Sequence, residues 1–83
     1  MTYTYATSGT CSRQIDFELD GNTIKNVVFT GGCHGNLQGI AKLVEGMNAE
    51  EAINRLRGIC CGSKTTSCPD QLALALEAAL QKQ

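Results

Sequence analysis

Residues 14–30, with the sequence QIDFELDGNTIKNVVFT, decide the fold class of this chain. Over 14–20 apolar and acidic side chains alternate, which predicts a half-buried antiparallel strand. Gly21 and Asn22 tolerate the backbone conformations of a tight hairpin turn. The β-branched and aromatic side chains that follow predict a returning strand over 24–30.

Outward from this hairpin, the period of the apolar residues changes. Before it, Tyr3 and Tyr5 alternate with threonines and indicate a further strand. After it, a helical spacing links Leu37, Ile40, Leu43, Val44 and Met47, and that helix should end near Gly46.

Two more helix starts are visible further along. Asn48 with Glu51 predicts a capping box, in which the Glu51 side chain reaches back to the cap, and Ser67 with Pro69 opens a last helix. Strands first and helices after predict a single α+β domain over 1–83. We expect a small antiparallel sheet of about three strands, followed by three helices packed on one face.

Size and composition limit the classes of function. A net charge of −1 and a pI near 5.7 give no basic face for nucleic acid. No apolar run approaches the roughly 20 residues that span a bilayer, and no charged-then-apolar leader follows Met1. Five cysteines, an odd number, favour reduced thiols in a cytoplasmic protein over a disulfide framework. A core this small supplies only about 3–5 kcal/mol of net stability, so a bound metal or a second copy of the chain would stabilise the fold. We expect a monomer or a homodimer.

Residues 31–36, GGCHGN, join the second hairpin strand to the first helix. Glycines let the backbone approach a ligand, and a helix N-terminus offers free N–H groups, so Gly32, His34 and Gly35 are candidate cofactor-binding residues. The same environment lowers the pKa of a thiol and makes Cys33 the best candidate for a thiolate. The alternative is a tight strand-to-helix connection in which the cysteine is an incidental small apolar residue. His34 could be a fourth metal ligand, a cation that stabilises a neighbouring thiolate, or a histidine that only faces solvent or makes a hydrogen bond. The spacing matches neither the phosphate loop nor the dinucleotide fingerprint.

The cysteines form a candidate metal site because zinc takes four thiolate or imidazole ligands in a tetrahedron. Adjacent cysteines seldom bind one ion together, so one of Cys60 and Cys61 would join three others, which are Cys11, Cys33 and Cys68. These thiols can also be buried without a function. A redox role would use Cys60 with Cys61, or Cys61 with Cys68, as a dithiol.

From residue 31 onward the chain resembles the TSCPD domain, which is named for the motif that stands here as Thr66-Ser67-Cys68-Pro69-Asp70. The resemblance also covers residues 31–40 and 58–61, and the front half is similar to short stand-alone members of that family. The family's best-known context is the C-terminal region of adenosylcobalamin-dependent ribonucleotide reductases, and stand-alone members are often labelled ribonucleoside-diphosphate reductase. This chain is too short for the barrel of those enzymes, so whether it is an enzyme stays open. The resemblance implies an accessory or regulatory role, with Cys33, Cys61 and Cys68 as thiols of a metal site.

A fainter resemblance is to iron–sulfur cluster scaffold proteins, which carry three cysteines at similar places. Cys11, Cys33 and Cys68 would occupy them, but the scaffold's aspartate after the first cysteine and its histidine before the third are absent.

Three hypotheses follow. The first is a metal-binding module in which Cys11, Cys33, Cys61 and Cys68 bind zinc, or alternatively iron or an iron–sulfur cluster, with a ribonucleotide reductase as a possible partner. The second is a thiol redox helper that passes electrons to a reductase. The third is a protein-interaction module with structural cysteines.

Overall fold

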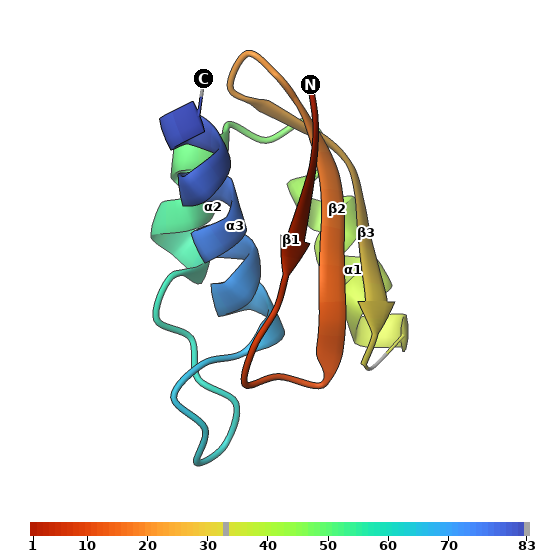
Figure 1. Cartoon of the computed structure of the whole chain (residues 1–83), viewed down its shortest axis with the longest axis vertical. Helices are drawn as coiled ribbons and strands as arrows, with labels where there is room; N and C mark the ends of the chain where they lie inside the picture. The colour runs from red at the N-terminus through yellow and green to blue at the C-terminus, as the bar shows by residue number, and fades with distance from the viewer. Residues whose placement is uncertain (33, 83) are drawn as a thin grey trace.

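The chain folds into a three-stranded antiparallel sheet followed by three helices, as predicted (Figure 1). The computed structural model describes residues 1–32 and 34–82. The strands are β1 (Thr2–Ala6), β2 (Ser12–Asp20) and β3 (Thr23–Gly31), and they lie in the order β1-β2-β3. The helices are α1 (His34–Val44), α2 (Ala49–Leu56) and α3 (Cys68–Lys82).

The predicted hairpin joins β2 to β3. Asp20 pairs with Thr23 across a two-residue turn in which Gly21 has a φ of +61°, a conformation that glycine adopts without strain. The N-terminal strand signal is also confirmed, since Tyr3 pairs with Phe17 and their rings stack with centroids 5.5 Å apart.

A bulge in β3 decides which of its side chains reach the core. The register shifts between Asp16 and Glu18, and Asn26 takes a positive φ of 54°. Ile24 and Val27 are three positions apart, yet both are buried, while Val28 is 56% exposed. With strict alternation from Ile24, Val28 would face the core. Because the bulge adds one residue to β3, Val27 faces the core instead.

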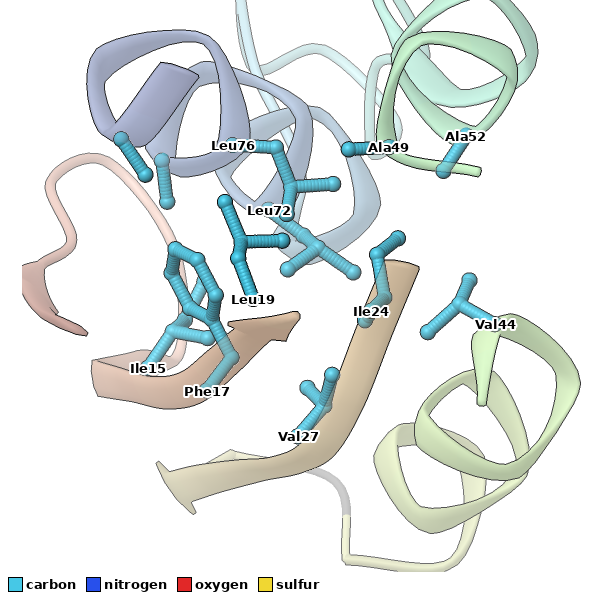
Figure 2. Packing of buried hydrophobic residues seen from close by; sticks show 12 residues of the cluster. Ile15, Phe17, Leu19, Ile24, Val27, Val44, Ala49, Ala52, Leu72 and Leu76 are labelled. Carbon is cyan, nitrogen blue, oxygen red and sulfur yellow. The ribbon is translucent and has the colours of Figure 1, made fainter. Parts of the chain in front are cut away.

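The core lies between one face of the sheet and the helices. Figure 2 shows Leu72 and Leu76 of α3 pointing toward side chains of β2. The largest of the fully buried side chains are those of Phe17, Ile15, Ile24, Leu72 and Leu76. On the opposite face of the sheet, Asp16 accepts hydrogen bonds from Thr4 at 2.7 Å and Gln14 at 3.0 Å.

The helices begin and end close to the predicted positions. Gly46, with a φ of +80°, follows α1, and the Asn48 side chain accepts hydrogen bonds from the N–H groups of Glu50 and Glu51 at the start of α2. The Glu51 side chain pairs with Arg55 at 3.0 Å, one turn along the helix, instead of reaching back to the cap. Leu43 departs from the predicted apolar stripe of α1, because it is 77% exposed.

Among the described residues, no helix is long and apolar enough to cross a membrane.

Candidate thiol site at the start of the last helix

The first turn of α3 is capped by Ser67. Its Oγ atom accepts a hydrogen bond from the Asp70 N–H at 3.2 Å, and its carbonyl oxygen accepts one from the Gln71 N–H at 2.8 Å. Pro69 fits this turn because a first-turn residue needs no N–H donor. Cys68 is therefore held at the positive end of a helix.

Side chains around Cys68 tie two loops to α3. Asp70 accepts hydrogen bonds from the Gly58 N–H at 2.7 Å and from the Thr66 hydroxyl at 2.5 Å, and Ser67 donates to the Ile59 carbonyl at 2.5 Å. These three bonds hold the loop between α2 and α3. Gln71 accepts a hydrogen bond from the Ser8 N–H at 3.2 Å, which attaches the loop between β1 and β2.

The second of these loops brings Cys11 to Cys68. The two Sγ atoms lie 3.9 Å apart, although the residues are 57 positions apart in sequence. Cys68 is buried and 7% exposed, whereas Cys11 is exposed. The Ser12 hydroxyl lies 3.1 Å from the Cys68 sulfur, so the buried thiol has a polar partner.

The surroundings of Cys68 favour its thiolate form. Burial raises the pKa of the thiol, but hydrogen bonds from the side chain and backbone of Ser12, from Thr10 and from Cys11 together lower the pKa below the ordinary 9.0. A cysteine with a lowered pKa is a better nucleophile and metal ligand than an ordinary one.

The glycine turn lies against Cys11 from the other side. Gly31 and Gly32 have φ values of +83° and +79°. A Cβ atom at Gly32 would lie 3.1 Å from the Cys11 sulfur and 2.9 Å from Leu37 Cδ1, so the position has room only for glycine. Cys33 itself lies outside the described residues, and its role remains the one predicted from the sequence.

A cavity of about 510 Å³ opens beside these thiols. Cys11, Cys61 and Cys68 are all in its wall, so three of the four predicted ligands share one space. Most of the remaining lining comes from α1 and includes the predicted cofactor-binding residue Gly35. The apolar part of the wall contains Leu37, Ile40 and Pro69.

Two predicted residues lie elsewhere. His34 Nε2 is 2.9 Å from the side-chain nitrogen of Gln38, and His34 lines a smaller hollow with Val27 and Phe29. Cys60 is exposed, and its thiol donates to the Gly58 carbonyl at 3.6 Å instead of lining the cavity. Of these two adjacent cysteines, Cys61 lines the cavity and Cys60 does not.

Within residues 1–32 and 34–82, no three His, Cys, Asp or Glu side chains are close enough to hold a metal ion. Cys11 and Cys68 are in contact, while Cys61 borders the same cavity without completing a triad. The described residues therefore supply one pair of soft ligands, Cys11 and Cys68, and a third thiol, Cys61, that lines the same cavity.

Thr10 and Ser12 are the site residues that the sequence did not single out. Both provide hydroxyl groups near the Cys68 sulfur, and Ser12 is 3% exposed. Their position next to Cys11 was the available signal, but serine and threonine are too common in loops for that signal to stand alone.

The comparison with known families agrees with the motif at the start of α3. The sequence model of the TSCPD domain matches residues 1–80, which is nearly the whole chain. The chain belongs to the TSCPD domain family. No curated protein and no solved structure matches the chain significantly. Family membership thus rests on the TSCPD match, and the geometry of the thiol site rests on this structure.

Proposed function

We propose that this TSCPD domain is a small thiolate metal-binding module. Cys11, Cys33, Cys61 and Cys68 would hold the ion, with zinc as the first choice and iron or an iron–sulfur cluster as the alternative. Thiolates suit all of these, since soft sulfur ligands favour zinc and iron–sulfur centres. A bound zinc ion would supply crosslinks between loops that are distant in sequence.

The contact between Cys11 and Cys68 carries the proposal. Two sulfurs that bind one tetrahedral zinc ion at 2.3 Å lie about 3.8 Å apart. The observed separation is 3.9 Å, so the pair already has the spacing of one edge of that tetrahedron. Free thiols in van der Waals contact have similar spacing, and for this reason the proposal needs the other ligands as well.

The other two ligands would come from segments next to this edge. Cys61 belongs to the loop that Asp70 holds at Gly58 and Thr66, and it faces the same cavity. Metal binding would require this loop to move inward and bring Cys61 to the pair, because no three such side chains cluster among the described residues. Cys33 follows Gly32, whose backbone packs against the Cys11 sulfur, and this neighbour supports the sequence-based choice of Cys33.

We infer the biological role of this module from the family to which the chain belongs. TSCPD domains are linked to ribonucleotide reductases, so we propose an accessory or regulatory role beside such an enzyme in the cytoplasm. The glycine turn, with Gly32, His34 and Gly35, would then serve mainly to bring backbone close to the thiols.

Metal analysis tests the proposal directly. Protein without a histidine tag is purified under anaerobic conditions, and zinc, iron and acid-labile sulfide are measured. About one zinc per chain without sulfide supports the module as proposed. Iron with sulfide would favour the cluster alternative, whereas absence of any metal after zinc reconstitution would refute the proposal.

Two adjacent cysteines provide a matched pair of variants. Cys61→Ser should lower the zinc affinity strongly and should also lower the stability that zinc confers, because ligand loss affects both. Cys60→Ser should leave both unchanged, since Cys60 does not line the cavity. Cys33→Ser tests the remaining ligand, and full zinc occupancy in that variant would remove Cys33 from the set.

A further inference from the structure

Among the cysteines that the structure describes, the pair in contact is not one of the two pairs that the sequence offered for redox chemistry. Cys60 with Cys61 and Cys61 with Cys68 were the candidate dithiols, but Cys11 and Cys68 are the ones whose sulfurs lie 3.9 Å apart. We propose that Cys11 and Cys68 form a reversible thiol–disulfide pair that is oxidised by low-molecular-weight disulfides entering the adjacent cavity.

The geometry permits this bond with little rearrangement. A disulfide has an S–S length of about 2.05 Å, so the two sulfurs must approach by about 1.9 Å. Cys11 lies in the loop just before β2 and is exposed, so its side chain is not enclosed by the core. Cys68 lies in the first turn of α3, so we expect the loop residue Cys11 to move toward it.

The difference in exposure sets the order of the two steps. The accessible Cys11 thiolate attacks one sulfur of glutathione disulfide, forms a mixed disulfide and releases one glutathione thiolate. The Cys68 thiolate then attacks the Cys11 sulfur, closes the Cys11–Cys68 bond and releases the second glutathione. The protein loses two electrons and two protons, and one glutathione disulfide is reduced to two molecules of glutathione.

The cavity gives the small disulfide a place to bind. Its volume of about 510 Å³ falls in the range of small-molecule sites, and both thiols are in its wall. Lys64 also lines it and can attract a carboxylate of the glutathione disulfide. By contrast, Cys60 is directed to the Gly58 carbonyl and lies outside this space.

Oxidation would also compete with metal binding. The same two sulfurs cannot form a disulfide and bind zinc as thiolates at the same time. If the metal proposal holds, the pair makes metal binding sensitive to redox state. The disulfide itself does not depend on that proposal, since it forms in metal-free protein.

Trypsin separates the cysteines in a way that makes the test direct. Cleavage after Lys and Arg leaves Cys11 in residues 1–13, Cys33 in 26–42, Cys60 with Cys61 in 58–64, and Cys68 in 65–82. Metal-free, reduced wild-type protein is incubated with increasing ratios of glutathione disulfide to glutathione, alkylated and analysed by mass spectrometry. We expect a cross-link between 1–13 and 65–82, with two of the five cysteines losing reactivity toward iodoacetamide.

Variants test the order of attack. Cys68→Ser should stop at glutathione bound to Cys11, and Cys11→Ser should leave the buried Cys68 largely unmodified. Cys60→Ser should form the same cross-link as wild type. A predominant cross-link between other peptides, or uniform glutathionylation without a cross-link in wild type, would overturn the proposal. Zinc content is measured separately, so failure of this proposal and failure of the metal module give different results.

Discussion

The two ends of α3 use the same helix in opposite ways. From Leu72 to Ala79 its buried face is apolar and packs on the sheet, with Leu72 and Leu76 fully buried. In its first turn, Asp70 and Gln71 are buried and polar, and each is hydrogen-bonded to a loop. Among the described residues no buried side-chain nitrogen or oxygen lacks a hydrogen-bond partner. One end therefore stabilises the domain by excluding water, and the other end positions loops around a thiol.

The largest effect should follow from truncation at the apolar end. Leu72→Ala removes a side chain that is 0% exposed, and such changes cost about 2–5 kcal/mol in the free energy of unfolding. A domain of this size has only about 3–5 kcal/mol of net stability, so the variant should be largely unfolded in water. Urea denaturation followed by circular dichroism measures this. A cost below about 1 kcal/mol would mean that the core is packed more loosely than the structure indicates.

The polar end should respond more weakly. Asp70→Ala removes the charged acceptor for the Gly58 N–H and the Thr66 hydroxyl, which should cost about 1.5–3 kcal/mol. Faster proteolysis of the loop between α2 and α3 should accompany the loss. Asp16→Ala is a control on the exposed sheet face, and its effect should stay within about 0.5 kcal/mol. If Asp70→Ala lowers the free energy of unfolding as much as Leu72→Ala does, the two ends of α3 do not differ in their contribution to stability.

The same carboxylate predicts a dependence on pH. The Thr66 hydroxyl and the Gly58 N–H lower the pKa of Asp70 below its ordinary 3.8, burial opposes them, and Arg57 adds a smaller attraction. A lowered folded-state pKa means that the contribution of Asp70 is present above 3.8 and is lost as the pH falls through the lower folded value. The stability difference between wild type and Asp70→Asn should thus be constant near neutral pH and shrink in acid. A difference that does not change with pH in acid would exclude this role.

Substitutions at two glycines test how closely the backbone packs against the thiol site. Gly32→Ala places a Cβ atom 2.9 Å from Leu37 Cδ1 at a residue with a φ of +79°, so we expect a cost of about 1–2 kcal/mol and altered reactivity of Cys11. Gly39→Ala is the matched variant inside α1, because a Cβ atom there meets nothing within 4 Å beyond its chain neighbours and the adjacent backbone of its own helix. It should raise stability by about 0.5–1 kcal/mol through helix propensity. Thermal unfolding measures the change in stability, and alkylation rates measure the reactivity of Cys11. Equal effects of the two substitutions would contradict the close contact at Gly32.

The smallest effect is expected at the rim of the cavity. Leu43 is 77% exposed although it follows the helical apolar spacing, so Leu43→Ala should change stability by less than about 0.5 kcal/mol. Chemical denaturation beside Leu72→Ala tests this directly. A loss above about 1 kcal/mol would show that Leu43 is covered, for example in a dimer.

Sequence patterns determined the framework because they depend on neighbours along the chain. The alternation of Ile15, Phe17 and Leu19 predicted β2 and its buried face, and the caps at Asn48 and Ser67 predicted the starts of α2 and α3. The motif around Cys68 predicted the family. All of these signals come from short stretches, where backbone geometry relates spacing to a face or a turn.

Only the tertiary structure decided which thiols meet. The contact of Cys11 with Cys68 depends on the position of the loop before β2 relative to the first turn of α3, and no local spacing encodes it. The bulge at Asn26 and the exposure of Leu43 were hidden for the same reason, since strand register and helix docking are set by packing between distant segments. The sequence by itself therefore determined the elements, the cap that holds Cys68 and the family, while the fold determined the partner of Cys68 and the cavity beside it.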